Sequence, residues 1–337
     1  MVAWERYQGS SLFLRKKAYF TLIGLIIMFA LMKLDYKRLL YLTLPLMLLS
    51  LVMLVAVFIP GIGLEAGGAR RWIGMGGLTF QPSELAKLAL ILYFSHILAK
   101  KREQTGDFYL GYLPMLLVLI FFFVLIILQP DMGTALLIGA VVFTMLFVGN
   151  IPLRYCLGTL LAAIPLLYIA VVSADYRIRR VLTFLNPWED PLDAGFQTTQ
   201  SFMALGRGGV LGLGLGESRQ KLFYLPEPHS DFIFSVIGEE LGLLGTLTVT
   251  LLFLTLVWRG VRAAVRCSEL QGTYLALGVS MLLGMQALMH MSVATGLMPA
   301  KGITLPFVSS GGSSLLVSLM GAGILLNISR KSRYNHA

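Results

Sequence analysis

The sequence predicts an all-α polytopic membrane protein, and two observations carry that prediction: the composition and the length of the apolar runs. Of the 337 residues, 57% are hydrophobic and only 13% are charged, whereas a soluble protein of this length carries far more charge. Several apolar runs approach or exceed the roughly 20 residues that a helix needs to cross a bilayer. The net charge of +10 fits basic loops at a membrane surface before it fits nucleic acid, which we do not expect as a partner.

Nine apolar segments predict nine transmembrane helices within a single transmembrane domain, residues 1–337. The connection 174–231 is too polar and too rich in Gly and Pro to span a membrane, so we expect a large extracytoplasmic loop there. No separate soluble domain is expected. The predicted spans are residues 18–32, 39–59, 80–99, 111–128, 133–150, 155–173, 232–257, 272–295 and 313–328.

The distribution of Lys and Arg over the short loops predicts the orientation. The loops on one side hold only Arg70, Arg71 and Lys301, whereas those on the other side, with the C-terminus, are rich in basic residues. The positive-inside rule therefore places the C-terminus in the cytoplasm. The basic residues of the cytoplasmic side are Lys33, Lys37, Arg38, Lys100, Lys101, Arg102, Arg154, Arg259, Arg262, Arg266, Arg330, Lys331 and Arg333.

The same rule predicts a further helix upstream of Met1. Nine spans with a cytoplasmic C-terminus place Arg15, Lys16 and Lys17 outside, against the charge rule. A misassigned start or a truncation of the chain explains this mismatch most simply. An unusual insertion of residues 1–32 is the alternative.

Glu227, His229 and Asp231 form the most informative cluster, because they stand at the mouth of the span that begins near residue 232. Ionisable groups in such a place are costly to keep and indicate a working site. The structural alternative is that Asp231 caps the helix and His229 binds loop carbonyls. A metal site is a weaker interpretation, because two ligands alone do not define one.

Glu84 and Lys87 are the second charged group, and they lie inside a predicted span. Pro82 fits the first turn of that helix. A spacing of three puts Glu84 and Lys87 on one face, where they can pair. The pair either locks the helix bundle or forms the charged wall of a cavity, and the two roles are compatible. In the next outer turn, Asp131 is predicted to cap the helix that starts near Gly133.

Two glycine-rich segments also lie on the predicted outer side. Residues 206–216 repeat Gly-x-Gly without a surrounding βαβ unit, so nucleotide binding is a weak interpretation. Tight turns and close backbone approach explain these glycines better. Lys221 follows with a cation suited to diphosphate oxygens. In the last outer loop, the Ser- and Gly-rich turn 309–314 exposes backbone N–H groups that favour anions; a flexible surface loop is the alternative.

A cavity that combines a carboxylate, cations and glycine turns suits an amphiphilic substrate with an anionic head group. The sequence blocks that carry these groups resemble the SEDS family, the polytopic glycosyltransferases of shape, elongation, division and sporulation, over essentially the whole chain. Residues 301–306 and 238–242 look like the division member of the family, with the elongation member as the nearest relative. The blocks are residues 69–87, 129–134, 186–201, 220–242 and 298–314.

The resemblance implies ten transmembrane helices, the first of them absent here, and polymerisation of lipid II at the outer face of the bacterial inner membrane during septal cell-wall synthesis. It makes Asp231 the catalytic general base. Ser310 and Asp193 depart from the Tyr and Gly that are common in the family. The expected substrate-binding residues are Arg71, Trp72, Glu84, Lys87, Gln200, Ser201, Gln220, Lys221, Glu227, His229, Lys301, Ser309, Gly311, Gly312 and Ser313.

The resemblance also implies partners. The family usually acts with a class B penicillin-binding transpeptidase, here FtsI-like, and we expect other divisome membrane proteins. A divalent cation, Mg²⁺ or Mn²⁺, is a candidate cofactor at the diphosphate. Two other classes of function stay open: a flippase for the lipid-linked precursor, which needs a similar charged cavity, and a scaffold that only recruits a partner. An elongation polymerase is the closest enzymatic alternative.

Overall fold

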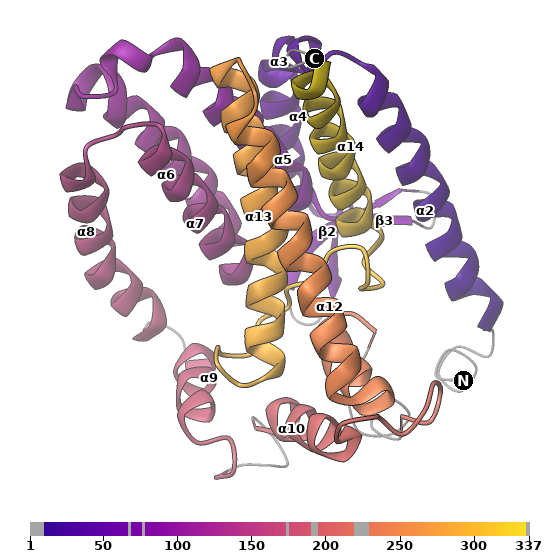
Figure 1. Cartoon of the computed structure of the whole chain (residues 1–337). Helices are drawn as coiled ribbons and strands as arrows, with labels where there is room; N and C mark the ends of the chain where they lie inside the picture. Colours follow the sequence, from indigo (N-terminus) through magenta and orange to yellow (C-terminus); the bar gives the residue numbers. More distant parts are fainter. Residues whose placement is uncertain are drawn as a thin grey trace. The chain divides into compact units, whose positions relative to one another are not determined.

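The computed structural model of the chain describes residues 10–66, 69–75, 78–172, 175–189, 195–218 and 229–334 (Figure 1). The chain forms two compact units. Unit 1 is built from Met1–Arg15, Gly158–Thr255 and Gln286–Gly311, and unit 2 from Lys16–Leu157, Leu256–Met285 and Gly312–Ala337. The prediction of one transmembrane domain stays a prediction.

Helices make up most of both units. Unit 2 holds the greater part of α2 (Ser10–Lys33), then α3 (Tyr36–Tyr41), α4 (Thr43–Ala56), α5 (Pro82–Lys100), η1 (Arg102–Gln104), the π-helix η2 (Phe108–Tyr112), α6 (Leu113–Leu128), α7 (Met132–Val148) and α14 (Gly312–Tyr334). Unit 1 holds α9 (Asp175–Leu185) and α10 (Phe196–Gly208). Besides α2, three helices begin in one unit and end in the other: α8 (Leu153–Val172), α12 (Ile233–Val265) and α13 (Leu270–Ala294).

Eight of the nine apolar segments predicted to span the membrane each coincide with one helix, and the segment 39–59 falls on two, α3 and α4. By length and composition, four helical stretches among the described residues can cross a bilayer: Phe108–Leu128, Ile233–Val265, Leu270–Ala294 and Gly312–Ser332. Helices α4, α7 and the first part of α8 are apolar but shorter. The chain is therefore a polytopic helical membrane protein, while the count of nine crossings stays a prediction.

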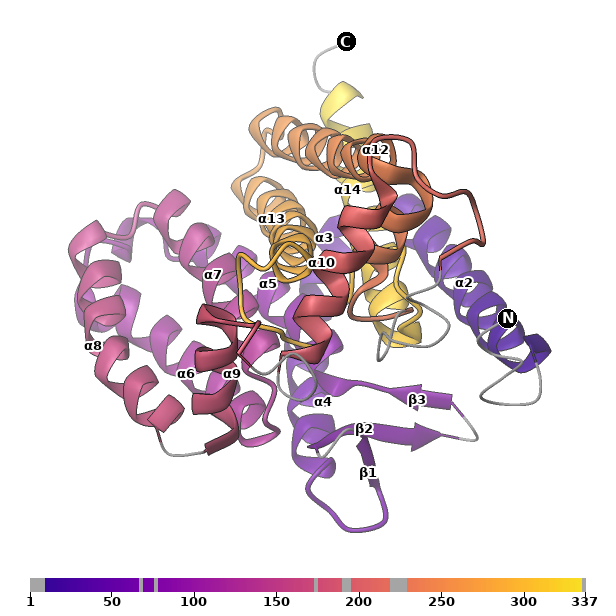
Figure 2. The same ribbon diagram turned by 90° about the horizontal axis from the view of Figure 1, so that it is seen from below.

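Two features of the connecting segments were not predicted. Residues 63–80 carry a small antiparallel sheet, β1 (Gly63–Ala66), β2 (Ala69–Met75) and β3 (Leu78–Phe80), with β2 between its neighbours (Figure 2). The glycine pairs of the sequence at 67–68 and 76–77 are a hairpin signal that explains it. The loop 174–231, in turn, contains the helices α9 and α10.

Helix α5 is the central element of unit 2. Every residue from Pro82 to Leu92 is buried, and the helix packs against α4, α6, α7 and α14. Pro82 occupies the first turn, where its missing N–H costs nothing and its fixed φ favours helix. The ionisable residues of this helix are thereby held in the interior of unit 2.

Helix α12 is broken at Gly242. The glycine-rich segment after α10 forms hydrogen bonds with the backbone groups that the break leaves without helical partners. Gly242 has φ 65° and ψ −159°, a conformation that L side chains rarely adopt. On one side of the break, the carbonyl of Glu239 accepts a hydrogen bond from the N–H of Leu213 at 3.0 Å. On the other side, the N–H of Leu243 donates to the carbonyl of Gly209 at 2.9 Å. Broken helices in membrane proteins need such substitutes, because lipid offers no hydrogen bonds.

The glycines of this segment allow two backbones to touch. A Cβ atom on Gly208 would lie 1.9 Å from the carbonyl oxygen of Gly238, and one on Gly212 would lie 2.2 Å from that of Glu240. Real side chains do not fit at such distances. The prediction of close backbone approach is confirmed for Gly208 and Gly212.

Replacing Gly242 with alanine is expected to lower the free energy of unfolding by at least about 3 kcal/mol. The new Cβ would meet the backbone nitrogen of Gly212 at 2.4 Å, and the positive φ adds strain. Gly206 is the matched control, because a Cβ there meets nothing within 4 Å. Gly206→Ala should be neutral or stabilising by up to about 1 kcal/mol in its helix. Unfolding midpoints in detergent measure both; equal midpoints for the two variants would contradict the account of the break.

Candidate functional site

Asp231 lies just before α12, in unit 1. The loop that precedes α14 is hydrogen-bonded to the two residues before Asp231. The hydroxyl of Ser309 donates to the carbonyl of Ser230 at 2.7 Å and accepts from the N–H of Leu305 at 2.8 Å. The N–H of Ser310 donates to the carbonyl of His229 at 2.9 Å. These bonds tie the backbone just before Asp231 to the loop.

Side-chain packing completes this arrangement. Phe232 is 2% exposed and packs with Val293, Met298 and Ala300. In the loop before α14, an ideal Cβ on Gly302 would lie 3.3 Å from Oδ2 of Asp231. Glycine at that position therefore lets the loop backbone come close to the carboxylate.

Lys301 stands next to this glycine and is a candidate for binding an anion. It is half-buried, and burial lowers the pKa of its ammonium below the ordinary value. Among the described residues it makes no ion pair. A cation that has lost part of its water without gaining a counterion binds an anionic ligand at less desolvation cost.

Two buried polar residues of α13 hold the other end of the loop, and sequence reasoning missed both. Nε2 of Gln286 donates to the carbonyl of Thr304 at 2.9 Å. Nδ1 of His290 lies 2.7 Å from the carbonyl oxygen of Ile303, and His290 is fully buried. The missed signal is the spacing of four residues in an apolar helix, which puts two costly polar groups on one face.

Gln200 and Ser201, expected to bind substrate, are buried in α10. The hydroxyl of Ser201 lies 2.6 Å from that of Ser235 on α12 and donates to the carbonyl of Ala294 on α13 at 2.6 Å. Ser201 therefore joins three helices of unit 1. Its expected contact with substrate stays a prediction.

Glu239 is fully buried in α12 and has the partner that its depth demands. The hydroxyl of Ser218 donates to Oε2 of Glu239 at 2.5 Å. Ser218 follows the glycine-rich segment 206–216. This bond therefore adds a side-chain contact to the backbone hydrogen bonds between that segment and α12. Glu239 thus supports α12, the helix that follows Asp231.

The second charged group lies in unit 2. Nζ of Lys87 is 2.8 Å from Oε2 of Glu84, and the two side chains are 2% and 6% exposed. The predicted pairing is confirmed. Asp231 and this pair belong to different units, so their convergence in one cavity stays a prediction.

The turn between α6 and α7 links this part of unit 2 together. Asp131 caps α7 by accepting from the N–H of Thr134 at 3.2 Å, as predicted, and its Oδ2 also accepts from Nε2 of Gln81 at 3.0 Å. Nε of Arg71, on β2, donates to the carbonyl of Gln129 at 3.0 Å. Arg71 and Trp72 were expected to bind substrate. The guanidinium of Arg71 is hydrogen-bonded to this turn, Trp72 is half-buried, and substrate binding by either stays a prediction.

The remaining expected site residues fall into two groups. Gly311, Gly312 and Ser313 lie where α14 begins, and the Oγ of Ser313 is buried without a hydrogen bond to any described residue. Gln220, Lys221, Glu227 and Asp193 lie outside the described residues. No group of three or more His, Cys, Asp and Glu side chains within the described ranges has the arrangement of a metal site. Mg²⁺ commonly binds through one or two carboxylates together with substrate phosphates, so the divalent cation expected at the diphosphate stays a prediction.

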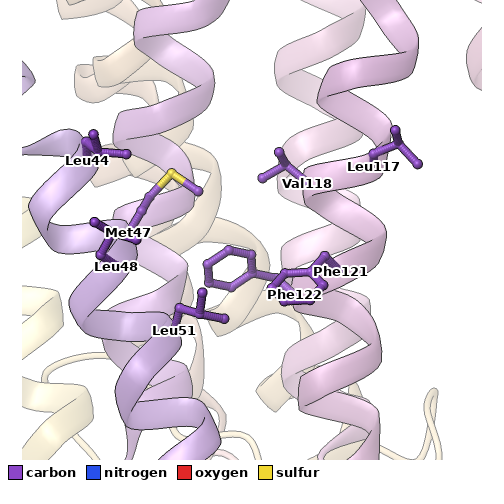
Figure 3. Close-up of a pocket in the computed structure, with 8 residues that line it drawn as sticks. All are labelled: Leu44, Met47, Leu48, Leu51, Leu117, Val118, Phe121 and Phe122. Atoms are coloured by element: carbon purple, nitrogen blue, oxygen red, sulfur yellow. The ribbon is translucent and has the colours of Figure 1, made fainter.

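A groove of about 310 Å³ runs between α4 and α6 in unit 2. The side chains drawn in Figure 3 come from both helices, and all are apolar. Such a lining suits hydrocarbon and offers no group for chemistry, so the reaction site lies elsewhere. The lining residues are Leu44, Met47, Leu48, Leu51, Leu117, Val118, Phe121 and Phe122.

Known proteins with similar sequences and structures identify the family. A family model described as the cell cycle proteins FtsW, RodA and SpoVE matches residues 1–334. The probable peptidoglycan glycosyltransferase FtsW of Geobacter sulfurreducens is 47% identical over 331 residues, 98% of this chain and 89% of the relative. The stage V sporulation protein E of Bacillus subtilis is 43% identical over 329 residues, 98% of this chain and 90% of the relative.

A solved structure supports the same assignment. A chain of a peptidoglycan synthase complex, described for its structural coordination of polymerization and crosslinking, aligns with a TM-score of 0.80 at 33% identity. The alignment covers 96% of this chain and 91% of that chain. The chain belongs to the FtsW, RodA and SpoVE family of cell cycle proteins, the SEDS family.

Proposed function

We propose that this protein is a peptidoglycan glycosyltransferase of the FtsW type, which polymerises lipid II into glycan strands in septal cell-wall synthesis. The observation that carries the proposal is Asp231, a carboxylate at a helix start whose backbone is fixed by Ser309 and Ser310. The names of the relatives agree with this reaction. We place the site on the extracytoplasmic face of the inner membrane, with the C-terminus in the cytoplasm, on the distribution of basic residues.

Asp231 acts as the general base. Its carboxylate takes the proton from the 4-hydroxyl of the acceptor sugar while that oxygen attacks the anomeric carbon of the donor. The bond from this carbon to the diphosphate breaks, and the lipid diphosphate leaves with the electron pair. One direct displacement converts an α-linked donor into a β-linked product, so the reaction inverts. A positioned base contributes about 10²–10⁴-fold to such a rate, and orientation and charge stabilisation supply the rest.

The diphosphate needs cations. Lys301 is suited to this role, because it is half-buried, makes no ion pair among the described residues and adjoins Gly302 at the carboxylate. Lys87, Arg71 and Lys221 are further candidates from the sequence. Lys87 already pairs with Glu84, and Arg71 binds two carbonyls. Lys301 is therefore the first choice in the described chain.

Replacing Ser309 with alanine is expected to slow polymerisation about ten-fold or more with little change in KM. The change removes a bond to the backbone beside Asp231, and small displacements of a catalytic group reduce rates strongly. Ser95→Ala is the matched control, because Ser95 is also buried but bonds only to the carbonyl of Leu92 in its own helix. Initial rates over a range of lipid II concentrations measure kcat and KM. A rise in KM at constant kcat would instead assign Ser309 to substrate binding.

The competing function is a flippase for the lipid-linked precursor, which needs similar buried charges. Purified protein in detergent separates the two, because no membrane remains to be crossed. The proposal predicts glycan strands from lipid II under these conditions. Unchanged lipid II, with protein that is folded and binds the lipid, would favour transport.

Partners follow from the same relatives. The similar chain in a peptidoglycan synthase complex supports a class B penicillin-binding transpeptidase as the partner that crosslinks the strands. We infer an FtsI-like enzyme, together with other divisome membrane proteins, since similar relatives carry the name FtsW. Copurification from cells that carry tagged protein tests this partner.

A further inference from the structure

The carboxyl end of α12 carries an exposed cluster of one tryptophan and three arginines. Trp258 is 58% exposed, and Arg259, Arg262 and Arg266 are exposed as well. Successive helical residues turn by about 100°, so the spacing of three and four puts the arginines within roughly 60° of one another. We call these four residues the basic face of α12.

The tryptophan and two of the arginines are in contact. The guanidinium carbons of Arg259 and Arg262 lie 5.9 and 5.5 Å from the centroid of the Trp258 ring, within the range of cation–π attraction. The negative end of the helix dipole explains cations in a last turn. The helix dipole does not explain why an exposed tryptophan lies beside Arg259 and Arg262.

Two acidic side chains of unit 2, Asp35 and Glu269, already pair with lysines. Nζ of Lys331 lies 2.5 Å from Oδ1 of Asp35, and Nζ of Lys37 lies 2.6 Å from Oε1 of Glu269. Those ammonium groups lower the pKa of both carboxyls. The arginines of the basic face make no ion pair with any residue in the described ranges. Their charge is therefore available to a ligand.

The position of the basic face at the end of α12 indicates which kind of ligand it binds. It ends a helix that is long and apolar enough to cross a membrane. Tryptophan and arginine side by side at such a place lie at the level of lipid head groups, and guanidinium groups match phosphate oxygens in two-pronged geometry. We propose that the basic face of α12 binds the phosphate of an anionic phospholipid, with the lipid tails along the helix. This site is separate from Asp231 and from the glycosyltransferase reaction.

The test uses the purified full-length chain in detergent, titrated with phosphatidylglycerol, cardiolipin or phosphatidylcholine and read by native mass spectrometry. The triple variant Arg259→Gln/Arg262→Gln/Arg266→Gln should bind the two anionic lipids on the order of 100-fold more weakly, at roughly five-fold per arginine. Binding of phosphatidylcholine should not change. The control variant Lys33→Gln/Arg38→Gln/Arg330→Gln removes the same charge from other exposed positions and should lose only a few-fold.

Two further arms keep the test decisive. Arg262→Lys keeps the charge but loses planar stacking and two-pronged binding, so it should weaken the anionic lipids several-fold even if the triple variant does not fold. Glycerol phosphate, which has the head group without tails, should not displace the lipid at equal concentration. Equal losses in the triple and control variants would overturn the proposal, since net charge alone would then explain binding. Full displacement by glycerol phosphate would overturn the lipid as ligand in favour of free phosphate.

Discussion

Replacing Lys87 with methionine is expected to lower the free energy of unfolding by about 3–5 kcal/mol, the cost of leaving one partner of a buried ion pair alone. Nζ of Lys87 and Oε2 of Glu84 are 2.8 Å apart, and both side chains are almost completely buried. The variant therefore keeps a carboxyl group in the interior of unit 2 without its cation. Denaturation midpoints in detergent measure the loss.

An exposed ion pair of the same unit provides the control. Nε of Arg70 lies 3.4 Å from Oε2 of Glu65, and the two side chains are 53% and 58% exposed. Arg70→Gln should lower the free energy of unfolding by less than about 1 kcal/mol. The double variant Glu84→Gln/Lys87→Met separates the two roles of the buried pair. If the pair only locks the bundle, this variant regains stability and activity together. If it is also the wall of a cavity, stability returns and polymerisation does not.

Asp231→Asn is expected to abolish glycan synthesis in cells while the protein still folds and binds its partner. Asparagine keeps the size of the side chain but cannot take a proton, so the rate should fall by the about 10²–10⁴-fold that a general base contributes. Complementation of a strain depleted of the native protein measures the effect. Full complementation by this variant would contradict a catalytic role for Asp231 and favour a scaffold that only recruits a partner.

The spans could be predicted because apolar runs are local and long. The nine predicted segments coincide with helices of the described chain, although their number as membrane crossings is a separate question. The same locality explains the success with Asp131, whose cap reaches only to Thr134. The Gly-x-Gly pattern of residues 206–216 likewise predicted close backbone approach, although it did not identify α12 as the partner.

The contacts that hold the candidate site could not be read from the sequence. Ser309 reaches back to Ser230, and Gln286 reaches forward to Thr304. Neither contact follows from a helical or strand period, because each depends on how distant segments meet. The resemblance implied substrate binding for Ser309, and that role stays a prediction; its bonds to Ser230 and Leu305 are what the sequence did not indicate. The break of α12 at Gly242 was missed for the same reason, since both halves are apolar enough to continue one helix.

The most direct test of the central claim compares purified wild-type protein with Asp231→Asn in one lipid II polymerisation assay in detergent. Glu217→Gln is the matched control, since it makes a similar carboxylate-to-amide change at an exposed position of unit 1. We expect glycan strands from the wild type and from Glu217→Gln, and none from Asp231→Asn at equal protein concentration. Strands of wild-type length and rate from Asp231→Asn would contradict the assignment of Asp231 as the base.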